Sequence, residues 1–150
     1  MLHLANLKVV VAVKQQSATN GGTLTSDNID TQGHDYVKII VHGTTSDNAT
    51  NNPSVLKVQQ ADTTDATNFA DITALVGDGS GGFTVPSSPT ATTTAPFAIL
   101  NVNMNGKKRY LRVLISPVTT QTYSAVALLG RSEVRPTGTS AENAAVVAYG

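Results

Sequence analysis

The side chains that could perform catalysis or bind a metal are few in this sequence, and they stand apart. A general base would have to be His3, His34 or His42, and no G-x-S-x-G element precedes a helix to supply an activated serine. Cysteine is absent, which excludes a disulfide framework and a thiolate metal site. His34 stands beside Asp35 and His42 follows an apolar run, but no two ligands alternate along a strand. We therefore expect neither nucleophilic catalysis nor a zinc site.

The carboxylates fall where aspartate usually has a structural role. Asp62, Asp65, Asp71 and Asp78 all stand in expected turns or at strand ends, where aspartate caps backbone groups. Glycoside hydrolysis needs two carboxylates that flank a cleft, and calcium needs several oxygen ligands. Asp78 stands alone among the glycines of 77–82. The sequence therefore predicts no enzyme, no catalytic residue, no metal and no cofactor.

The only dense positive cluster consists of Lys107, Lys108, Arg109 and Arg112. Such a cluster can contact phosphates or an acidic protein surface, and it can also be a solvated strand end that protects a sheet from aggregation. Nucleic-acid binding is the least supported of these readings, because base stacking needs interleaved aromatic residues and Tyr110 is alone. We keep the four residues as a candidate protein interface and expect no nucleic-acid partner.

The composition limits how a partner can be recognised. Charged residues make up 13% of the 150 residues and cancel to a net charge of zero, so no general attraction to nucleic acid or to an anionic membrane is expected. The apolar start of the chain is interrupted by Lys8 and is too short to span a bilayer. A partner must therefore be bound by shape and polar contacts. The length suits one domain with a substantial core.

The stretch 96–117 gives the clearest local pattern. Asn105 and Gly106 form the dipeptide that best tolerates the positive φ angles of a type I′ turn, and apolar strand candidates flank them. Both arms carry large apolar residues on both faces, which requires cover on each side. We therefore predict a β-hairpin at the centre of a two-layer sandwich.

Other segments show the twofold alternation or the β-branched composition of strands. Phe69–Val76 has a spacing that also suits one helical turn, and the residues around it favour the strand. The glycines of 77–82 and the segment 86–96 are expected loops. The strands expected outside the hairpin are Leu7–Val13 (ending near Lys14), Tyr36–His42, Val55–Gln60, Phe69–Val76, Phe83–Val85 and Tyr123–Gly130. Together they predict an all-β fold, an antiparallel, jelly-roll-like β-sandwich of about seven or eight strands.

The two ends of the chain are candidate attachment segments. We expect residues 1–135 to form the sandwich and 136–150 to form a C-terminal arm, because the Ala- and Val-rich end has no evident partner strand in the chain. Extended apolar segments can add to a foreign sheet edge, although an ordinary core strand is the favoured reading of the first segment, and the second can equally be a disordered tail. Surplus apolar surface also suggests closed cyclic symmetry, and we expect a trimer. The apolar interface candidates are Leu7, Val9, Val11, Val146, Val147 and Tyr149.

Four stretches resemble the head decoration (cement) proteins of tailed bacteriophages. They are 29–36 (IDTQGHDY), 55–62 (VLKVQQAD), 108–113 (KRYLRV) and 126–130 (VALLG), within Ile29 to Pro136. The resemblance implies a β-sandwich, often trimeric, that binds the outside of the expanded capsid and locks neighbouring capsomers. It implies the major capsid protein as partner, a location on the virion after assembly in the bacterial host cytoplasm, and no catalytic residues.

Two further non-enzymatic readings stay open. A phage tail or fibre component would share this composition. A carbohydrate-binding module would also use a sandwich, but such sites stack sugars on exposed aromatic rings, and the chain has no Trp and only four Tyr. An enzyme is the least supported class, because no acid and base residues are brought together by the pattern.

Overall fold

The computed structural model describes residues 7–19, 21–43, 53–85, 97–131 and 146–150. One turn of 3₁₀ helix, η2 (Ala66–Asn68), precedes the sixth strand. No membrane-spanning helix is found among the described residues. The strands are β1 (Lys8–Ala18), β2 (Leu24–Thr25), β3 (Ile29–Asp30), β4 (Tyr36–Gly43), β5 (Pro53–Ala61), β6 (Ala70–Val76), β7 (Ala98–Asn103), β8 (Tyr110–Pro117), β9 (Gln121–Gly130) and β10 (Val146–Tyr149).

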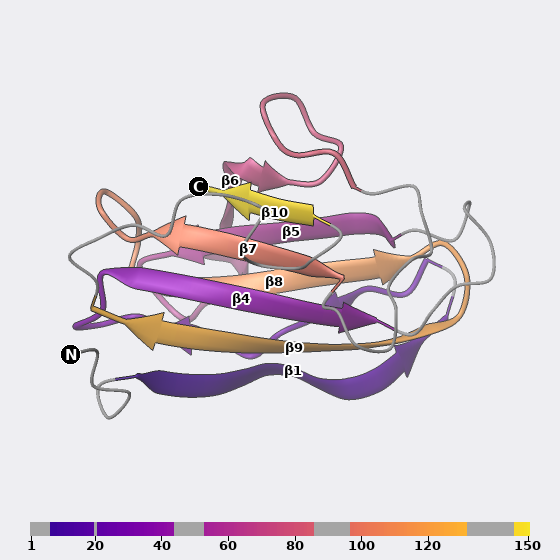
Figure 1. Cartoon of the computed structure of the whole chain (residues 1–150), viewed down its shortest axis with the longest axis horizontal. Helices are drawn as coiled ribbons and strands as arrows, with labels where there is room; N and C mark the ends of the chain where they lie inside the picture. The colour runs from indigo at the N-terminus through magenta and orange to yellow at the C-terminus, as the bar shows by residue number, and fades with distance from the viewer. Residues whose placement is uncertain (1–6, 20, 44–52, 86–96, 132–145) are drawn as a thin grey trace.

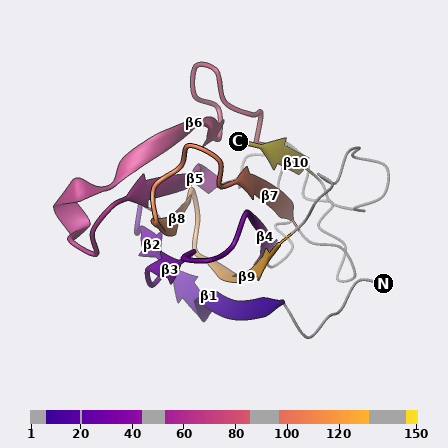
Figure 2. The ribbon, with the colours of Figure 1, turned by 90° about the vertical axis from the view of Figure 1, so that its left-hand side faces the viewer.

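The strands form two sheets that pack face to face. Sheet A has the order β1-β9-β4-β7-β10, and sheet B has the order β2-β8-β5-β6, with β3 also paired to β8. The side view of Figure 2 shows the two layers, and sheet A faces the viewer in Figure 1. If β2 and β3 count as one interrupted strand, the first eight strands lie in the orders 1-8-3-6 and 2-7-4-5, which is the jelly-roll arrangement. The predicted all-β sandwich is confirmed, with β10 added at one edge.

Alternation along the strands produces the core. In β4 and β9 every second residue is buried, because successive side chains point to opposite faces of the sheet and only one face meets the other layer. Sheet A contributes Ile39, Leu100 and Leu129, and sheet B contributes Leu56 and Ile115, all fully buried. Strands predicted from this alternation over 36–42, 55–60 and 123–130 are present, and β6 confirms the strand at 69–76.

The predicted hairpin is wrong, because its two arms lie in different sheets. β7 pairs with β4 and β10 in sheet A, whereas β8 pairs with β2, β3 and β5 in sheet B. The turn between them has a positive φ only at Gly106 (73°), and the Lys107 amide donates to the Met104 carbonyl (3.1 Å), which is the pattern of a type II turn rather than type I′. Each arm is apolar on both faces because each lies inside its own sheet, and the sequence pattern cannot distinguish this from pairing with each other.

Two other boundaries differ from expectation. β1 continues beyond Lys14 to Ala18, because an edge strand pairs on one side only and tolerates polar residues facing solvent. Phe83–Val85 does not form a strand, and Phe83 makes only an isolated bridge to Gly77. The Val85 amide instead donates to Oδ1 of Asp78 (2.9 Å), so it does not extend a ladder.

The end of the chain has a partner within the same molecule. β10 runs parallel to β7 in sheet A, and Ala148 is buried. Gly150 continues the pairing, since its amide donates to the Asn101 carbonyl and its carbonyl accepts from the Asn103 amide (both 2.9 Å). The expectation that this segment lacks a partner in the chain is therefore wrong for 146–150. Residues 136–145 of the expected arm, and the expected loop 86–96, lie outside the described residues.

Candidate interaction surface

The outer face of sheet A carries a continuous row of aliphatic residues. The registers of the four strand pairs align one residue from each strand, and alternation places all of them on the face opposite the core. In the order of the strands across the sheet, the row is Val11, Val126, Ile40, Ile99 and Val147. We call these five residues the apolar row. Val11 is exposed, Val126, Ile40 and Val147 are partly buried, and Ile99 is buried.

The neighbouring row on the same face is mixed. It consists of Val9, Leu128, Lys38, Asn101 and Tyr149. The Tyr36 hydroxyl donates to Oδ1 of Asn101. The Tyr149 hydroxyl oxygen is a buried polar atom without a hydrogen-bond partner in the described part of the chain. The two rows together make this face mostly apolar. It is buried at β7, where Ile99 and Asn101 are 4% and 1% exposed, and open at β1, where Val9 and Val11 are exposed.

The structure gathers most of the apolar interface candidates on this face. Val9 and Val11 lie at one edge, on β1, and Val147 and Tyr149 lie at the opposite edge, on β10 (Figure 1). Leu7 precedes β1, and its side chain lies next to Gly130 of β9. Val146 instead points to the inner face and packs against the core.

Sequence reasoning missed the residues that join the two edges. Ile40, Val126 and Leu128 occupy the alternate positions of β4 and β9, opposite to the fully buried set. In a sheet with one solvated face these positions are normally polar. Both strands alternate strictly, and these positions are nevertheless aliphatic. This is the signal in the sequence that indicates an apolar outer face.

The basic cluster lies elsewhere, and its strongest member is already paired. Arg109 binds Asp30 through two bonds, Nε to Oδ1 (2.8 Å) and Nη2 to Oδ2 (2.7 Å). The hydrogen bond from Arg109 and a second from the Gln32 amide hold the pKa of the Asp30 carboxyl well below its usual range. The same pair raises the pKa of Arg109, whose guanidinium also lies 4.9 Å from the centre of the Tyr110 ring.

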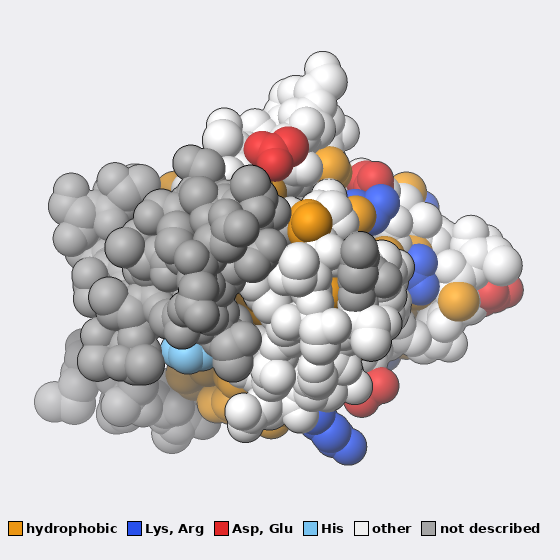
Figure 3. Space-filling model, turned by 90° about the vertical axis from the view of Figure 1, so that its right-hand side faces the viewer, with side chains coloured by type: hydrophobic (Ala, Val, Ile, Leu, Met, Phe, Trp, Pro, Cys, Tyr) orange, Lys and Arg blue, Asp and Glu red, His pale blue; other side chains and the backbone are white. Residues whose placement is uncertain are grey.

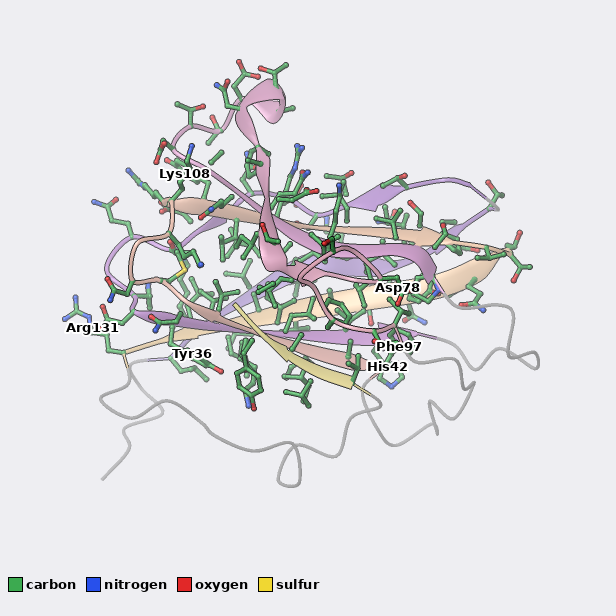
Figure 4. All side chains as sticks on the ribbon, turned by 90° about the horizontal axis from the view of Figure 1, so that it is seen from above. Tyr36, His42, Asp78, Phe97, Lys108 and Arg131 are labelled. Atoms are coloured by element: carbon green, nitrogen blue, oxygen red, sulfur yellow. The ribbon has the colours of Figure 1, made fainter. Side chains whose placement is uncertain are left out.

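Two other basic residues, Lys108 and Arg112, are also engaged on the side of sheet B. Lys108 forms an ion pair with Asp62 (3.1 Å), and Figure 4 shows it far from Tyr36 and His42, which lie on the side of sheet A. The Arg112 Nε donates to Oε1 of Gln59 (2.8 Å), and its guanidinium lies 4.2 Å from the centre of the Phe69 ring. Lys107 lies in the turn after β7 and is partly buried. Three of the four cations of the cluster therefore already have a neighbouring partner in the fold.

A further network completes the polar outer face of sheet B. Asp71 of β6 accepts from Gln59 Nε2 (2.6 Å) and forms an ion pair with Lys57 (3.0 Å). Partial burial would raise the pKa of the Asp71 carboxyl, but the hydrogen bonds from Gln59 and Lys57 outweigh it and lower the pKa. Charges on this face are thus satisfied by neighbours from the same sheet.

The residues considered for catalysis or metal binding have local structural roles. Oδ1 of Asp65 accepts from the Thr67 amide (2.9 Å) at the start of η2, and Oδ1 of Asp78 accepts from the Val85 amide (2.9 Å) across the glycine loop. The ring of His34 contacts the Gln32 carbonyl at the surface. Within the described ranges, no three His, Asp or Glu side chains come close enough together to hold a metal ion.

The end of the molecule near the C-terminus of β4 is shown in Figure 3. The described charged side chains on this face are few, and acidic and basic ones are interspersed among hydrophobic and uncharged ones. This view adds no patch of a single charge to the described surface.

No protein-family model matches the chain, and no curated protein sequence is significantly similar to it.

Proposed function

We propose that this chain is a non-enzymatic structural protein of a tailed-bacteriophage virion, which decorates the outside of the capsid and stabilises it by bridging subunits of the major capsid protein. The observation that carries the proposal is the exposed and partly buried part of the apolar row on the outer face of sheet A, which consists of Val11, Val126, Ile40 and Val147. In this proposal the copies are trimeric, and they join the virion in the bacterial host cytoplasm.

The electrostatics favour attachment through apolar contact. The net charge is zero, and Arg109, Lys108 and Arg112 are engaged with neighbours, so long-range attraction to a partner is weak. Fully buried interface cores are depleted of charged residues and rich in apolar ones. The apolar row has this composition, and in this proposal it covers a junction between two subunits.

The arrangement supports carbohydrate binding less well. Sugar sites in sandwiches use exposed aromatic rings as stacking platforms. Phe69 lies against the guanidinium of Arg112, and Tyr110 lies against that of Arg109. A tail or fibre component would share the fold and the apolar face, and gold labelling of the protein on intact virions distinguishes tail from capsid.

The test of the apolar face is Val126→Lys, at the middle of the row. A lysine there would bring a charge into a desolvated contact, so we expect affinity for expanded capsids that lack the protein to fall by at least about tenfold. The measurement is sedimentation of capsids with bound protein over a concentration series.

Thr25→Lys is the matched control, because Thr25 is exposed on the outer face of sheet B. It should bind as the original protein does, and thermal unfolding confirms that both variants are folded. Full capsid occupancy by a folded Val126→Lys variant would remove the outer face of sheet A from the attachment surface. Equal loss in both variants would also contradict the proposal.

A further inference from the structure

We propose that the free edge of β1 pairs with the β1 edge of a second copy of this chain, in antiparallel orientation around a twofold axis at Val9. The contact extends sheet A of one copy into sheet A of the other. The inference comes from the edge itself and does not depend on the proposed function.

The edge is open and apolar. Within the described residues, β1 is the end strand of sheet A and pairs there with β9 alone, so alternate backbone amide and carbonyl groups face outward (Figure 1). Four large hydrophobic residues are exposed among the described residues, and three of them belong to this edge: Leu7 (38%), Val9 (60%) and Val11 (55%). A regular apolar edge strand of this kind is a template for strand addition.

Only the first part of β1 is available for pairing. The register with β9 is regular from Lys8 to Val11 and is then interrupted by irregularities between Val11 and Val13 and between Val13 and Gln16. At the first of these, the Ala12 carbonyl accepts from the Asp27 amide (3.3 Å). The bulges and this bond protect the second half of the edge, so within the described residues a partner strand can occupy 7–11.

This short segment is complementary to itself. An antiparallel pair centred on Val9 places Val9 opposite Val9 and Leu7 opposite Val11, so that all three exposed aliphatic residues meet an aliphatic residue. Lys8 is the only charged residue in the segment; it then stands opposite Val10, and its Nζ already donates to the Asp30 carbonyl (3.1 Å). A pair centred on Val11 would instead place Lys8 opposite Lys14, and like charges across a pair are destabilising.

The symmetry of the contact is closed. A twofold contact uses the same segment on both copies and cannot continue into a fibre. Five residues on each copy form a small interface, so the dimer is expected to be weak in dilute solution and to strengthen where copies are held close together. If the copies are also trimeric, the twofold contact would link neighbouring trimers.

The absence of cysteine allows a direct test by cross-linking. Val9→Cys introduces the only thiol of the chain at the proposed axis, and Val118→Cys introduces it at the remaining exposed hydrophobic position (37%), which follows β8 outside the edge. Each purified variant is oxidised with copper phenanthroline in air, and disulfide-linked dimer is followed on non-reducing gels. We expect Val9→Cys to cross-link at least about tenfold faster than Val118→Cys, because pairing holds its thiols together.

A second pair of variants tests the register. Leu7→Cys mixed with Val11→Cys should form the mixed dimer faster than either variant forms its own. Equal rates for Val9→Cys and Val118→Cys would overturn the proposal. The same holds if Val9→Cys does not cross-link while Val9→Lys loses capsid binding, because the edge would then pair with a different protein. Cross-linking uses the isolated protein, so its outcome is independent of whether the protein binds capsids.

Discussion

The outer faces of the two sheets differ in chemistry although they cover one common core: sheet B carries paired charges beside a few aliphatic residues such as Leu114, and sheet A carries an aliphatic row. On sheet B, Arg109 is paired with Asp30, and Asp71 is bound by Lys57 and Gln59. On sheet A, the equivalent face presents the apolar row and the exposed valines of β1. A sheet whose polar groups are satisfied internally has little left to offer a partner, whereas exposed aliphatic residues are stabilised when another surface covers them. This difference is the reason that we propose sheet A as the binding side.

The largest expected effect is a difference in stability between a core substitution and an apolar-row substitution on the same strand. Ile39 and Ile40 are adjacent on β4, but Ile39 is fully buried between the sheets and Ile40 belongs to the row. Ile39→Ala should lower the free energy of unfolding by about 2–5 kcal/mol, because it removes a packed side chain and leaves a cavity. Ile40→Ala should cost about 1 kcal/mol or less, since its side chain is only partly covered.

Urea unfolding of both variants measures this difference in stability. Capsid binding should rank the two variants in the opposite order. Ile40→Ala should reduce binding, while Ile39→Ala should bind normally at temperatures where it is folded. Equal destabilisation by the two substitutions would show that Ile40 is as well covered as the core. The distinction between an inner face and an interacting outer face would then be wrong for sheet A.

A smaller effect is expected at the connection between the two sheets. Gly106 has φ 73° in the turn from β7 to β8, and a Cβ added there would meet no atom within 4 Å. Gly106→Val should therefore destabilise by about 1 kcal/mol or more through backbone strain alone. Gly106→Asn is the control, because asparagine tolerates positive φ better than a β-branched residue.

Thermal unfolding of the two variants measures the strain. If Gly106→Val melts at the temperature of the original protein, the left-handed backbone at this turn is not required. The test also bears on the comparison of the sheets, because this turn carries the chain from sheet A into sheet B.

The fold could be predicted from the sequence to the extent that local alternation determines it. The strands around Ile39, Val58 and Ala127 follow from their twofold pattern, and the turn signals between them give a sandwich. Which strands pair is a different question, because a strand that is apolar on both faces fits any interior position of either sheet. This is why β7 and β8 were predicted as a hairpin and why β10 was predicted without a partner.

The candidate surface was predictable only in part, for a similar reason. Val9, Val11 and Val147 stand out as apolar residues at the ends of the chain, but their common face depends on the registers of four strand pairs. In the basic cluster, Arg109 is paired with Asp30, which is 79 residues away in the sequence. Local charge density cannot reveal a partner brought close by the sheet.

The smallest expected effect concerns that ion pair, and it has a defined pH dependence. The pKa of Asp30 is lowered in the folded protein by its hydrogen bonds to Arg109 and the Gln32 amide, whereas in the unfolded chain it is near the ordinary value of about 4. A depressed folded-state pKa contributes stability that is present above the unfolded pKa and is lost as the pH falls below it. Because the pair is exposed, the contribution is small.

Asp30→Asn should therefore melt slightly below the original protein at pH 7, and the two melting temperatures should converge as the pH falls from 4 toward 2. Salt should reduce the difference at pH 7, because exposed ion pairs are screened. A difference that persists unchanged at pH 2 would mean that Asp30 stabilises the fold through its size or its bond to the Gln32 amide. The polar face of sheet B would then be held together by packing and neutral hydrogen bonds, and its paired charges would not explain why it differs from sheet A.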